Sequence, residues 1–176
     1  MIDFSQNHFE LFGLPLGYRI DAGVVERAYR ALQTRVHPDR HAAGSDADKR
    51  LALQASARVN EAYRTLQDPV ARAAYLLQLR GVDVAAETDN RLPLDFLTRQ
   101  LERREAADEA MDDHDDAALS SIAREVRDDA AKAEIEVARA FDADDVEAAR
   151  SAVRELRFLV KLAEDLDAMH AAEIDR

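Results

Sequence analysis

The sequence predicts an all-α protein with two parts: a helical hairpin with short flanking helices, and a C-terminal bundle of three long helices. Apolar residues recur at intervals of three and four along most of the chain, as in helices buried on one face. All 5 glycines and all 4 prolines lie at or before Pro93. Residues 1–80 hold 11 basic and 9 acidic residues, a net of +2, whereas residues 81–176 hold 13 and 27, a net of −14.

These shifts in composition coincide, and they predict domains at 1–80 and 93–176 with a linker at 81–92. The absence of cysteine excludes disulfides, thiolate metal sites and cysteine nucleophiles. A net charge of −12 argues against a nucleic-acid partner. No secretory signal pattern and no membrane-length apolar run is seen, so we expect a cytoplasmic protein with no membrane contact.

The N-terminal region begins with a short apolar helix or turn around Phe9, which we expect to stop at Pro15 and Gly17. Asp21 can cap the next helix, whose apolar spacing continues to Val36. Pro38 then closes this helix, because the residue before a proline is pushed out of the helical region.

Two further helices complete this region. Ser45 and Asp48 resemble a capping box for the third helix. Asp68-Pro69 is expected to begin the fourth helix, and Gly81 to end it. The residues that we expect the third helix to bury are Leu51, Ala55, Val59, Ala62, Tyr63 and Leu66.

Three long helices are expected in the C-terminal region, at about 93–111, 116–141 and from Asp142 or Asp144 onward. The expected core positions of the last two are Leu119, Ile122, Val126, Ala130, Ala133, Val137 and Ala140, then Val146, Ala149, Val153, Leu156, Val160 and Ala163. An intermolecular coiled coil is an alternative. The short connections favour an antiparallel bundle within one chain.

His37, Pro38 and Asp39 form the sharpest chemical feature, in a loop between two predicted helices. Histidine can donate and accept hydrogen bonds near neutral pH, and aspartate can pair with a partner's arginine. The preceding helix supplies nearby arginines, so the loop and helix would form a small docking surface for an acidic partner. A plain helix-ending turn is the alternative. The arginines are Arg27, Arg30 and Arg35.

A metal site at His37, Asp39 and His41 is disfavoured, because Pro38 stiffens the turn and no further ligands cluster nearby in the sequence. His114 lies among four aspartates and is expected in a solvated turn between helices. No phosphate loop or nucleophile elbow is present. We therefore expect no metal, no cofactor and no enzymatic activity.

Three motifs occur in the order and spacing of a J-domain: FELFGLP at 9–15, HPDR at 37–40 and NEAYRTL at 60–66. Residues 8–79 thus resemble the module by which DnaJ-type co-chaperones act on heat-shock ATPases of the DnaK/HscA type. The Gly/Phe-rich linker and cysteine-rich repeats of generic DnaJ proteins are missing. Instead the chain continues with ARAAYLL at 71–77, QLERRE at 100–105 and VRELRFL at 153–159.

This continuation resembles the HscB family of iron–sulfur cluster co-chaperones over nearly the whole chain, in its bacterial form. The resemblance implies an L-shaped protein whose J-domain stimulates ATP hydrolysis by HscA and whose bundle delivers the scaffold IscU. The implied chaperone-binding residues are His37, Pro38, Asp39, Arg27, Arg30, Arg35 and Arg40. The implied scaffold-binding residues are Leu97, Thr98, Leu101, Glu102, Glu105, Glu109 and Phe158.

Two of these positions depart from the family's usual residues. Arg40 stands where lysine is commoner, which keeps the charge. Thr98 stands where methionine is typical, so the resemblance implies a smaller apolar contact at this position. On periodicity alone Leu97, Leu101 and Phe158 would be core residues. Only the resemblance favours exposure.

Two other functions remain open at this point. The chain could be a J-domain co-chaperone of a general DnaK-type chaperone, with another client or with a bundle that dimerises. It could also be an acidic helical adaptor or a metal-binding protein in which the His-Pro-Asp match is accidental. Stimulation of a heat-shock ATPase, binding of the scaffold and metal analysis separate these alternatives.

Overall fold

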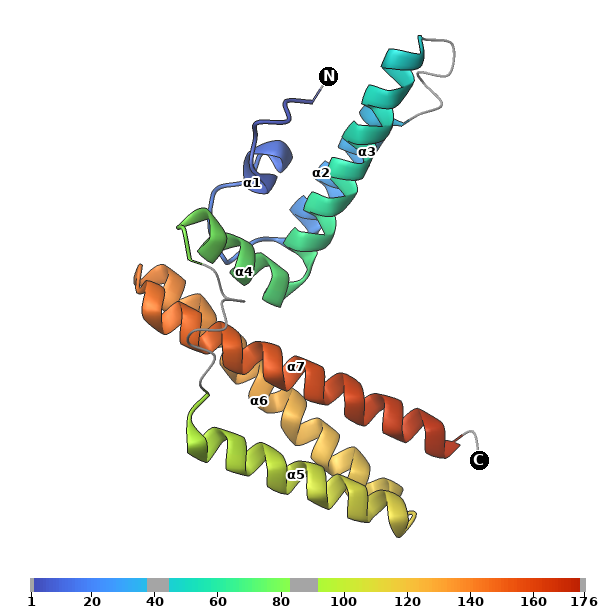
Figure 1. Cartoon of the computed structure of the whole chain (residues 1–176), viewed down its shortest axis with the longest axis vertical. Coiled ribbons are helices and arrows are strands. Elements are labelled where there is room, and N and C mark those ends of the chain that lie inside the picture. The colour runs from blue at the N-terminus through green and yellow to red at the C-terminus, as the bar shows by residue number, and fades with distance from the viewer. Residues whose placement is uncertain (1, 38–44, 83–91, 175–176) are drawn as a thin grey trace. The chain divides into compact units, whose positions relative to one another are not determined.

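The computed structural model describes residues 2–37, 45–82 and 92–174 (Figure 1). Over these residues the chain forms seven helices and no strand, which confirms the prediction of an all-α fold. The chain divides into two compact units, residues 1–80 and 81–176. Most of the predicted linker at 81–92 lies outside the described residues.

The N-terminal unit is built on a hairpin of α2 (Ala22–Val36) and α3 (Asp46–Gln67), which lie side by side. The short α1 (His8–Phe12) packs against both helices, and α4 (Pro69–Leu79) follows α3 and packs against it. Apolar side chains from all four helices make one core, since each helix alone could bury only one face. Its largest fully buried side chains are Phe9, Val25, Val59, Leu66 and Leu77.

The predicted caps hold two of these helices in place. The carboxylate of Asp21 accepts hydrogen bonds from the backbone N–H groups of Gly23 at 2.7 Å and Val24 at 3.1 Å. Ser45 and Asp48 form the expected reciprocal capping box at the start of α3. These side chains satisfy N–H groups that have no partner within the helix. Both predictions are confirmed.

The end of α1 differs from the prediction. The helix stops before Gly13, which adopts a left-handed conformation with φ +67°. Glycine has no Cβ and reaches this conformation at low cost, so the helix closes before the chain meets Pro15 or Gly17.

The inner face of α3 is also shifted from the prediction. Leu51 and Tyr63 are only half-buried, whereas Ala52 is buried. Ala52, Ala55 and Val59 follow one another at steps of three and four and form the inner face. Tyr63 lies at the edge of that face, where its hydroxyl reaches a carboxylate of α2.

His8 anchors α1 to the rest of the N-terminal unit. His8 is 3% exposed, and its ring stacks on that of Tyr75 of α4 with centroids 4.1 Å apart. The backbone N–H of His8 donates to the Tyr75 hydroxyl at 3.1 Å. Burial lowers the pKa of His8, the positive charge of Arg58 lowers it further, and Glu61 opposes these effects. The neutral imidazole is therefore the form that fits this site.

Acidification is expected to destabilise the N-terminal unit through His8. Because the folded state lowers the pKa of His8 below its usual 6.5, the unfolded chain binds more protons in the window beneath that value. The stabilising contribution of the neutral His8 is complete above its usual pKa of 6.5 and is lost as the pH falls below that value. The free energy of unfolding, measured by urea titration followed by circular dichroism, should fall more steeply in wild type than in His8→Phe. Equal slopes would contradict this prediction.

The C-terminal unit contains α5 (Leu94–Asp112), α6 (Asp116–Asp142) and α7 (Val146–Ile174). Helices α6 and α7 form a long hairpin, and α5 packs along part of it (Figure 1). The three-helix bundle is therefore confirmed. The buried residues that join α5 to the hairpin are Phe96, Ala107, Ala110, Leu119, Ala123, Val126, Leu159, Leu162, Ala163 and Leu166.

The turns between these helices share one design. His114 and Asp144 both adopt the left-handed conformation, with φ of +54° and +55°. The aspartate after each then caps the next helix: Asp115 accepts from the N–H of Ala118 at 2.9 Å, and Asp145 from that of Ala148 at 3.0 Å. The cap of α7 is thus Asp145, and the predicted caps at Asp142 or Asp144 are wrong.

The buried stripes of the hairpin are close to the predicted ones. Val146 and Val160 in α7 are only half-buried, as are Ile122, Ala130 and Ala133 in α6. In the second half of α7 the buried residues only partly coincide with the predicted stripe, because the core there also includes Phe96, Ala107 and Ala110 of α5. Leu159, Leu162 and Leu166 are buried there.

Candidate functional site

The first candidate site lies at the end of α2. His37 follows the last residue of this helix, Val36, with φ −57° and ψ 128°, and its side chain is exposed. The other loop residues assigned from the sequence, Pro38, Asp39 and Arg40, lie outside the described residues. A histidine at this position can meet a partner protein without any change in the helix that carries it.

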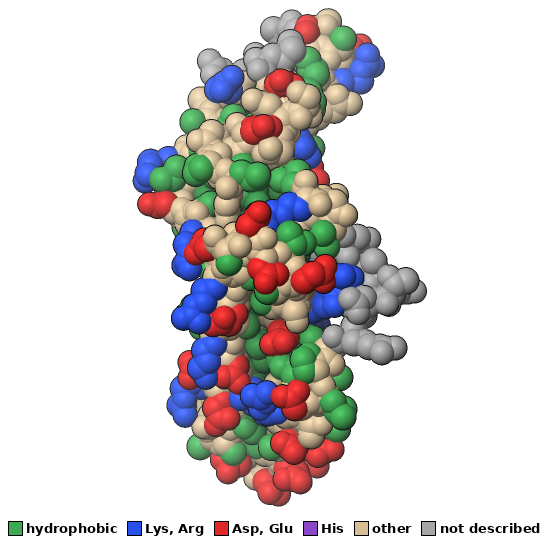
Figure 2. All heavy atoms as spheres, turned by 90° about the vertical axis from the view of Figure 1, so that its left-hand side faces the viewer, with side chains coloured by type: hydrophobic (Ala, Val, Ile, Leu, Met, Phe, Trp, Pro, Cys, Tyr) green, Lys and Arg blue, Asp and Glu red, His purple; other side chains and the backbone are tan. Residues whose placement is uncertain are grey.

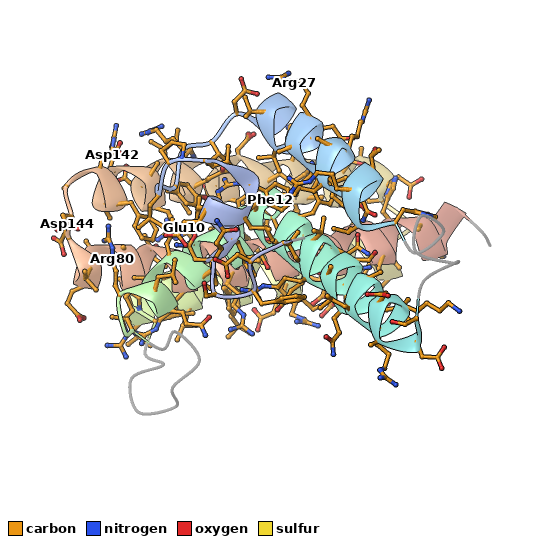
Figure 3. The ribbon with its side chains drawn as sticks, turned by 90° about the horizontal axis from the view of Figure 1, so that it is seen from above. Glu10, Phe12, Arg27, Arg80, Asp142 and Asp144 are labelled. Carbon is orange, nitrogen blue, oxygen red and sulfur yellow. The ribbon has the colours of Figure 1, made fainter. Side chains whose placement is uncertain are left out.

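Three arginines accompany His37 on α2. Arg27, Arg30 and Arg35 are all exposed, and their spacing places them on one broad side of the helix. Arg27 projects outward near the start of α2 (Figure 3). The structure thus presents a basic helix surface that ends at His37, which suits an acidic partner.

Arg30 is held by contacts that the sequence analysis missed. Its Nε donates to Glu26 Oε1 at 2.8 Å, one turn earlier on α2. From α3, the hydroxyl of Tyr63 donates to the other carboxylate oxygen of Glu26. The spacing of Glu26 and Arg30 by four residues is a signal for such an ion pair. The Tyr63 contact joins two helices and had no signal in the sequence.

The same hydrogen bonds shift the pKa values of Glu26 and Tyr63. The hydroxyl of Tyr63, and then Arg30, stabilise the charged form of Glu26 and lower its pKa. The Glu26 carboxylate in turn raises the pKa of Tyr63. At neutral pH the carboxylate is ionised and the phenol is protonated, so the chain of hydrogen bonds from Tyr63 to Arg30 persists.

Aromatic stacking fixes Tyr63 on its other side. The rings of Tyr29 and Tyr63 stack with centroids 3.9 Å apart, which ties α2 to α3. The hydroxyl of Tyr29 donates to Asn60 Oδ1 at 2.9 Å and accepts from Gln33 Nε2 at 3.1 Å. This half-buried polar layer holds the two helices in register beside the arginine-bearing face.

The second candidate site is an apolar patch on the C-terminal unit, formed by Leu94, Leu97 and Leu101 of α5 and Phe158 of α7. Leu97 is 38% exposed, Leu101 58% and Phe158 36%, so the core positions that periodicity alone would give them are wrong. Leu94 is 78% exposed and was missed. Its position one turn before Leu97 on the same helix is the signal that could have found it.

The patch exists because α5 is apolar on two opposite sides. Its inner side turns Phe96, Ala107 and Ala110 toward the hairpin, so the leucines of the other side face solvent. Phe158 of α7 reaches α5 through an edge-to-face contact with Phe96, at a centroid distance of 5.6 Å. Exposed leucine and phenylalanine side chains on two packed helices are typical of a protein-binding surface.

Carboxylates continue the outer face of α5 beyond the patch. Glu102, Glu105 and Glu109 are exposed and form no ion pair within the part of the chain that the structure describes. Asp and Glu side chains gather over the C-terminal helices, at the lower end of the face shown in Figure 2. Thr98 turns its hydroxyl onto its own helix, where it donates to Leu94 O at 2.9 Å. The surface therefore offers an apolar anchor followed by negative charge.

Glu155 is a second carboxylate near the patch that the sequence analysis did not single out. It lies on α7 one turn before Phe158 and is half-buried. Burial raises its pKa, Arg99 of α5 lowers it, and Asp95 raises it again. Its environment shows that α5 and α7 approach each other at this end of the patch.

An ion pair attaches α5 to the hairpin behind the patch. Arg103 donates to Asp129 of α6 at 2.7 Å and to Gln100 at 3.1 Å, and Gln100 is itself buried. Burial would raise the pKa of Asp129, but hydrogen bonds from Lys132 and Arg103 and their charges lower it overall. The pair keeps the helix that carries the patch in a fixed orientation.

Replacing Arg103 with Ala is expected to destabilise the C-terminal unit. The side chains of Arg103 and Asp129 are largely covered, at 16% and 23% exposure, so this pair should contribute about 1–2 kcal/mol, more than a fully exposed pair would. The melting temperature, measured by thermal unfolding, should be lower for Arg103→Ala than for wild type. Arg104→Ala removes the same charge from the neighbouring exposed position and serves as the control. Equal melting temperatures for the two variants would contradict the prediction.

The described ranges contain neither a candidate metal site nor a candidate membrane span. No group of three histidine or carboxylate residues there could hold a metal ion, and His114 occupies a turn. None of the helices described is both long and apolar enough to cross a bilayer. The alternating set at 37, 39 and 41, which the sequence disfavours as a metal site, lies partly outside the described residues.

Each of the two units matches a known protein family. Residues 7–75 match the DnaJ domain family, and residues 92–167 match the family described as the HSCB C-terminal oligomerisation domain. The chain is 42% identical over 168 residues to a co-chaperone protein HscB homolog of Burkholderia multivorans, with 96% of each chain covered. The corresponding homolog of Cupriavidus taiwanensis is 45% identical over 161 residues, with 92% of each covered.

Solved structures agree with these matches. Chaperone HscB from Vibrio cholerae superposes with a TM-score of 0.83 at 34% identity, covering 93% of this chain and 96% of that one. Human co-chaperone protein HscB superposes with a TM-score of 0.88 at 29% identity, covering 95% and 83%. Both units of the chain are therefore matched, one by the DnaJ domain family and the other by the HSCB C-terminal family, and the HscB structures cover nearly the whole chain. This chain belongs to the HscB family of J-domain co-chaperones.

Proposed function

We propose that this protein is a cytoplasmic co-chaperone of iron–sulfur cluster assembly. Its N-terminal unit stimulates ATP hydrolysis by an HscA-type heat-shock ATPase, and its C-terminal unit binds an IscU-type scaffold and delivers it to that ATPase. The observation that carries the proposal is the exposure of Leu97, Leu101 and Phe158 on a helical unit of the HscB type. Exposed apolar side chains followed by carboxylates favour a protein partner.

The N-terminal unit acts on the ATPase by binding. His37, with Pro38, Asp39 and Arg40 after it, engages the ATPase, while Arg27, Arg30 and Arg35 contact an acidic surface of the same partner. This contact must be stronger in the hydrolysis-competent state of the ATPase than in its resting state, because a ligand with equal affinity for both would shift nothing. The chain performs no catalysis itself.

The C-terminal unit recruits the scaffold. Leu97, Leu101 and Phe158 insert into an apolar surface of the scaffold, and Glu102, Glu105 and Glu109 pair with basic residues around it. Thr98 contributes only its methyl group there, because its hydroxyl is bonded to the helix backbone. Linking the two binding units in one chain raises the effective concentration of the scaffold at the ATPase.

Single-turnover ATP hydrolysis by an HscA-type ATPase, with this protein and with or without the scaffold, tests the proposal. Stimulation that the scaffold enhances would support both halves of it. Stimulation that ignores the scaffold would favour a co-chaperone of a general DnaK-type chaperone with another client. No stimulation would overturn the proposal and return the acidic adaptor as the better explanation.

A further inference from the structure

We propose that Tyr63 is a positioning residue for the ATPase contact, which acts through Glu26 to hold Arg30 in its binding orientation. The inference deepens the proposed function and rests on it. Tyr63 belongs to α3 and lies at the edge of the N-terminal core, away from the loop that carries His37. Its role comes from a chain of contacts between the two hairpin helices.

The chain of contacts has three links. Stacking on Tyr29, with centroids 3.9 Å apart, fixes the plane of the Tyr63 ring. The Tyr63 hydroxyl donates to Glu26 Oε2, which fixes the carboxylate. The other oxygen of that carboxylate, Oε1, accepts from Arg30 Nε at 2.8 Å. A single carboxylate thus transmits the position of a half-buried tyrosine to an exposed arginine, whose side chain is 75% exposed.

This restraint is specific to one of the three arginines. Within the described residues, Arg27 and Arg35 form no side-chain hydrogen bond or ion pair, whereas Arg30 is bonded to Glu26. A free arginine loses much of its rotamer entropy when it binds a partner, and this loss opposes binding. Arg30 has lost part of that freedom before it binds, so its contact should be the most favourable of the three.

The atoms used by the restraint leave the binding end of Arg30 available. Glu26 accepts from Nε, and within the described residues the two terminal nitrogens of Arg30 have no hydrogen bond. Those two nitrogens form the fork that binds a carboxylate through paired hydrogen bonds. The ligand class for this site is therefore a carboxylate of the partner ATPase. Glu26 itself is satisfied by both of its partners and does not compete for the fork.

Tyr63→Phe tests this role, because it removes the hydroxyl and keeps the ring stack. We expect a roughly threefold rise in the concentration of this protein that gives half-maximal ATPase stimulation, as for the loss of one exposed hydrogen bond, with an unchanged maximal rate. Glu26→Gln should act in the same direction and serves as a second variant. Tyr75→Phe removes the hydroxyl of another half-buried tyrosine in the same unit and should leave this concentration unchanged.

A double-mutant cycle separates positioning from a structural effect. In the Arg30→Ala background, Tyr63→Phe should cause no further change, because the residue through which it acts is gone. Additive effects of the two substitutions would overturn the inference, as would a wild-type half-maximal concentration in Tyr63→Phe. ATPase stimulation by the His37→Gln variant is measured in the same experiment. If wild type itself fails to stimulate more than His37→Gln, the proposed function fails and this inference with it.

Discussion

The His37→Gln variant is expected to fold normally and to lose all stimulation of the partner ATPase. His37 is exposed and follows the last residue of α2, and its backbone conformation is open to any residue. Glutamine therefore fits without strain, and no core packing is lost. The imidazole, however, is the group that we place against the ATPase. Single-turnover hydrolysis should return to the rate measured without this protein.

The other unit of the same molecule supplies the control for His37→Gln. We propose that the scaffold binds to the patch of α5 and α7, so the variant should bind the scaffold with wild-type affinity. Circular dichroism should show an unchanged melting temperature, since a surface turn residue is replaced by a polar one. Normal stimulation by a folded His37→Gln protein would show that the loop does not act as a J-domain loop.

The Leu101→Ala variant is expected to bind the scaffold about tenfold more weakly, a loss of ~1.4 kcal/mol that is typical of an apolar anchor in an interface. Leu101 is 58% exposed, so its truncation leaves no cavity in the bundle, and the free energy of unfolding should stay at the wild-type value. Isothermal titration calorimetry against the scaffold measures the affinity.

A matched substitution on the same unit controls for general loss of apolar surface. Ile135 of α6 is 49% exposed and lies outside the patch, so Ile135→Ala removes a comparable apolar surface without touching the proposed contact. Its affinity should equal that of wild type. Equal weakening by the two substitutions, or none by Leu101→Ala, would show that the scaffold does not bind through this patch.

Local signals in the sequence were sufficient for most of the helices. Asp21 and the Ser45–Asp48 box mark the starts of α2 and α3, because they supply acceptors that the first turn of a helix lacks. The proline at position 38 predicts the end of α2 at Val36. Such signals act over three or four residues and do not depend on the rest of the fold.

The errors arose where two local signals competed. Gly13 ended α1 before Pro15 could, because its left-handed conformation satisfies the last carbonyls of the helix. In the turn before α7, Asp144 adopts the left-handed conformation, so the next residue, Asp145, is the one that caps the helix. Several aspartates stand together there, and each is a good cap by propensity. Backbone geometry selected among them.

The order of the motifs along the chain was enough to assign the family. Helix caps and apolar spacing are local properties, and they were enough to assign the all-α class. The sequence pattern was not enough to separate the binding surface of α5 from its core positions. This helix is apolar on two sides, so Leu97 and Phe96 look alike in the sequence. The packing of α5 against α6 and α7 buried Phe96 and left Leu97 exposed. The contact of Tyr63 with Glu26 likewise exists because the fold brings residues 37 positions apart into hydrogen-bond range.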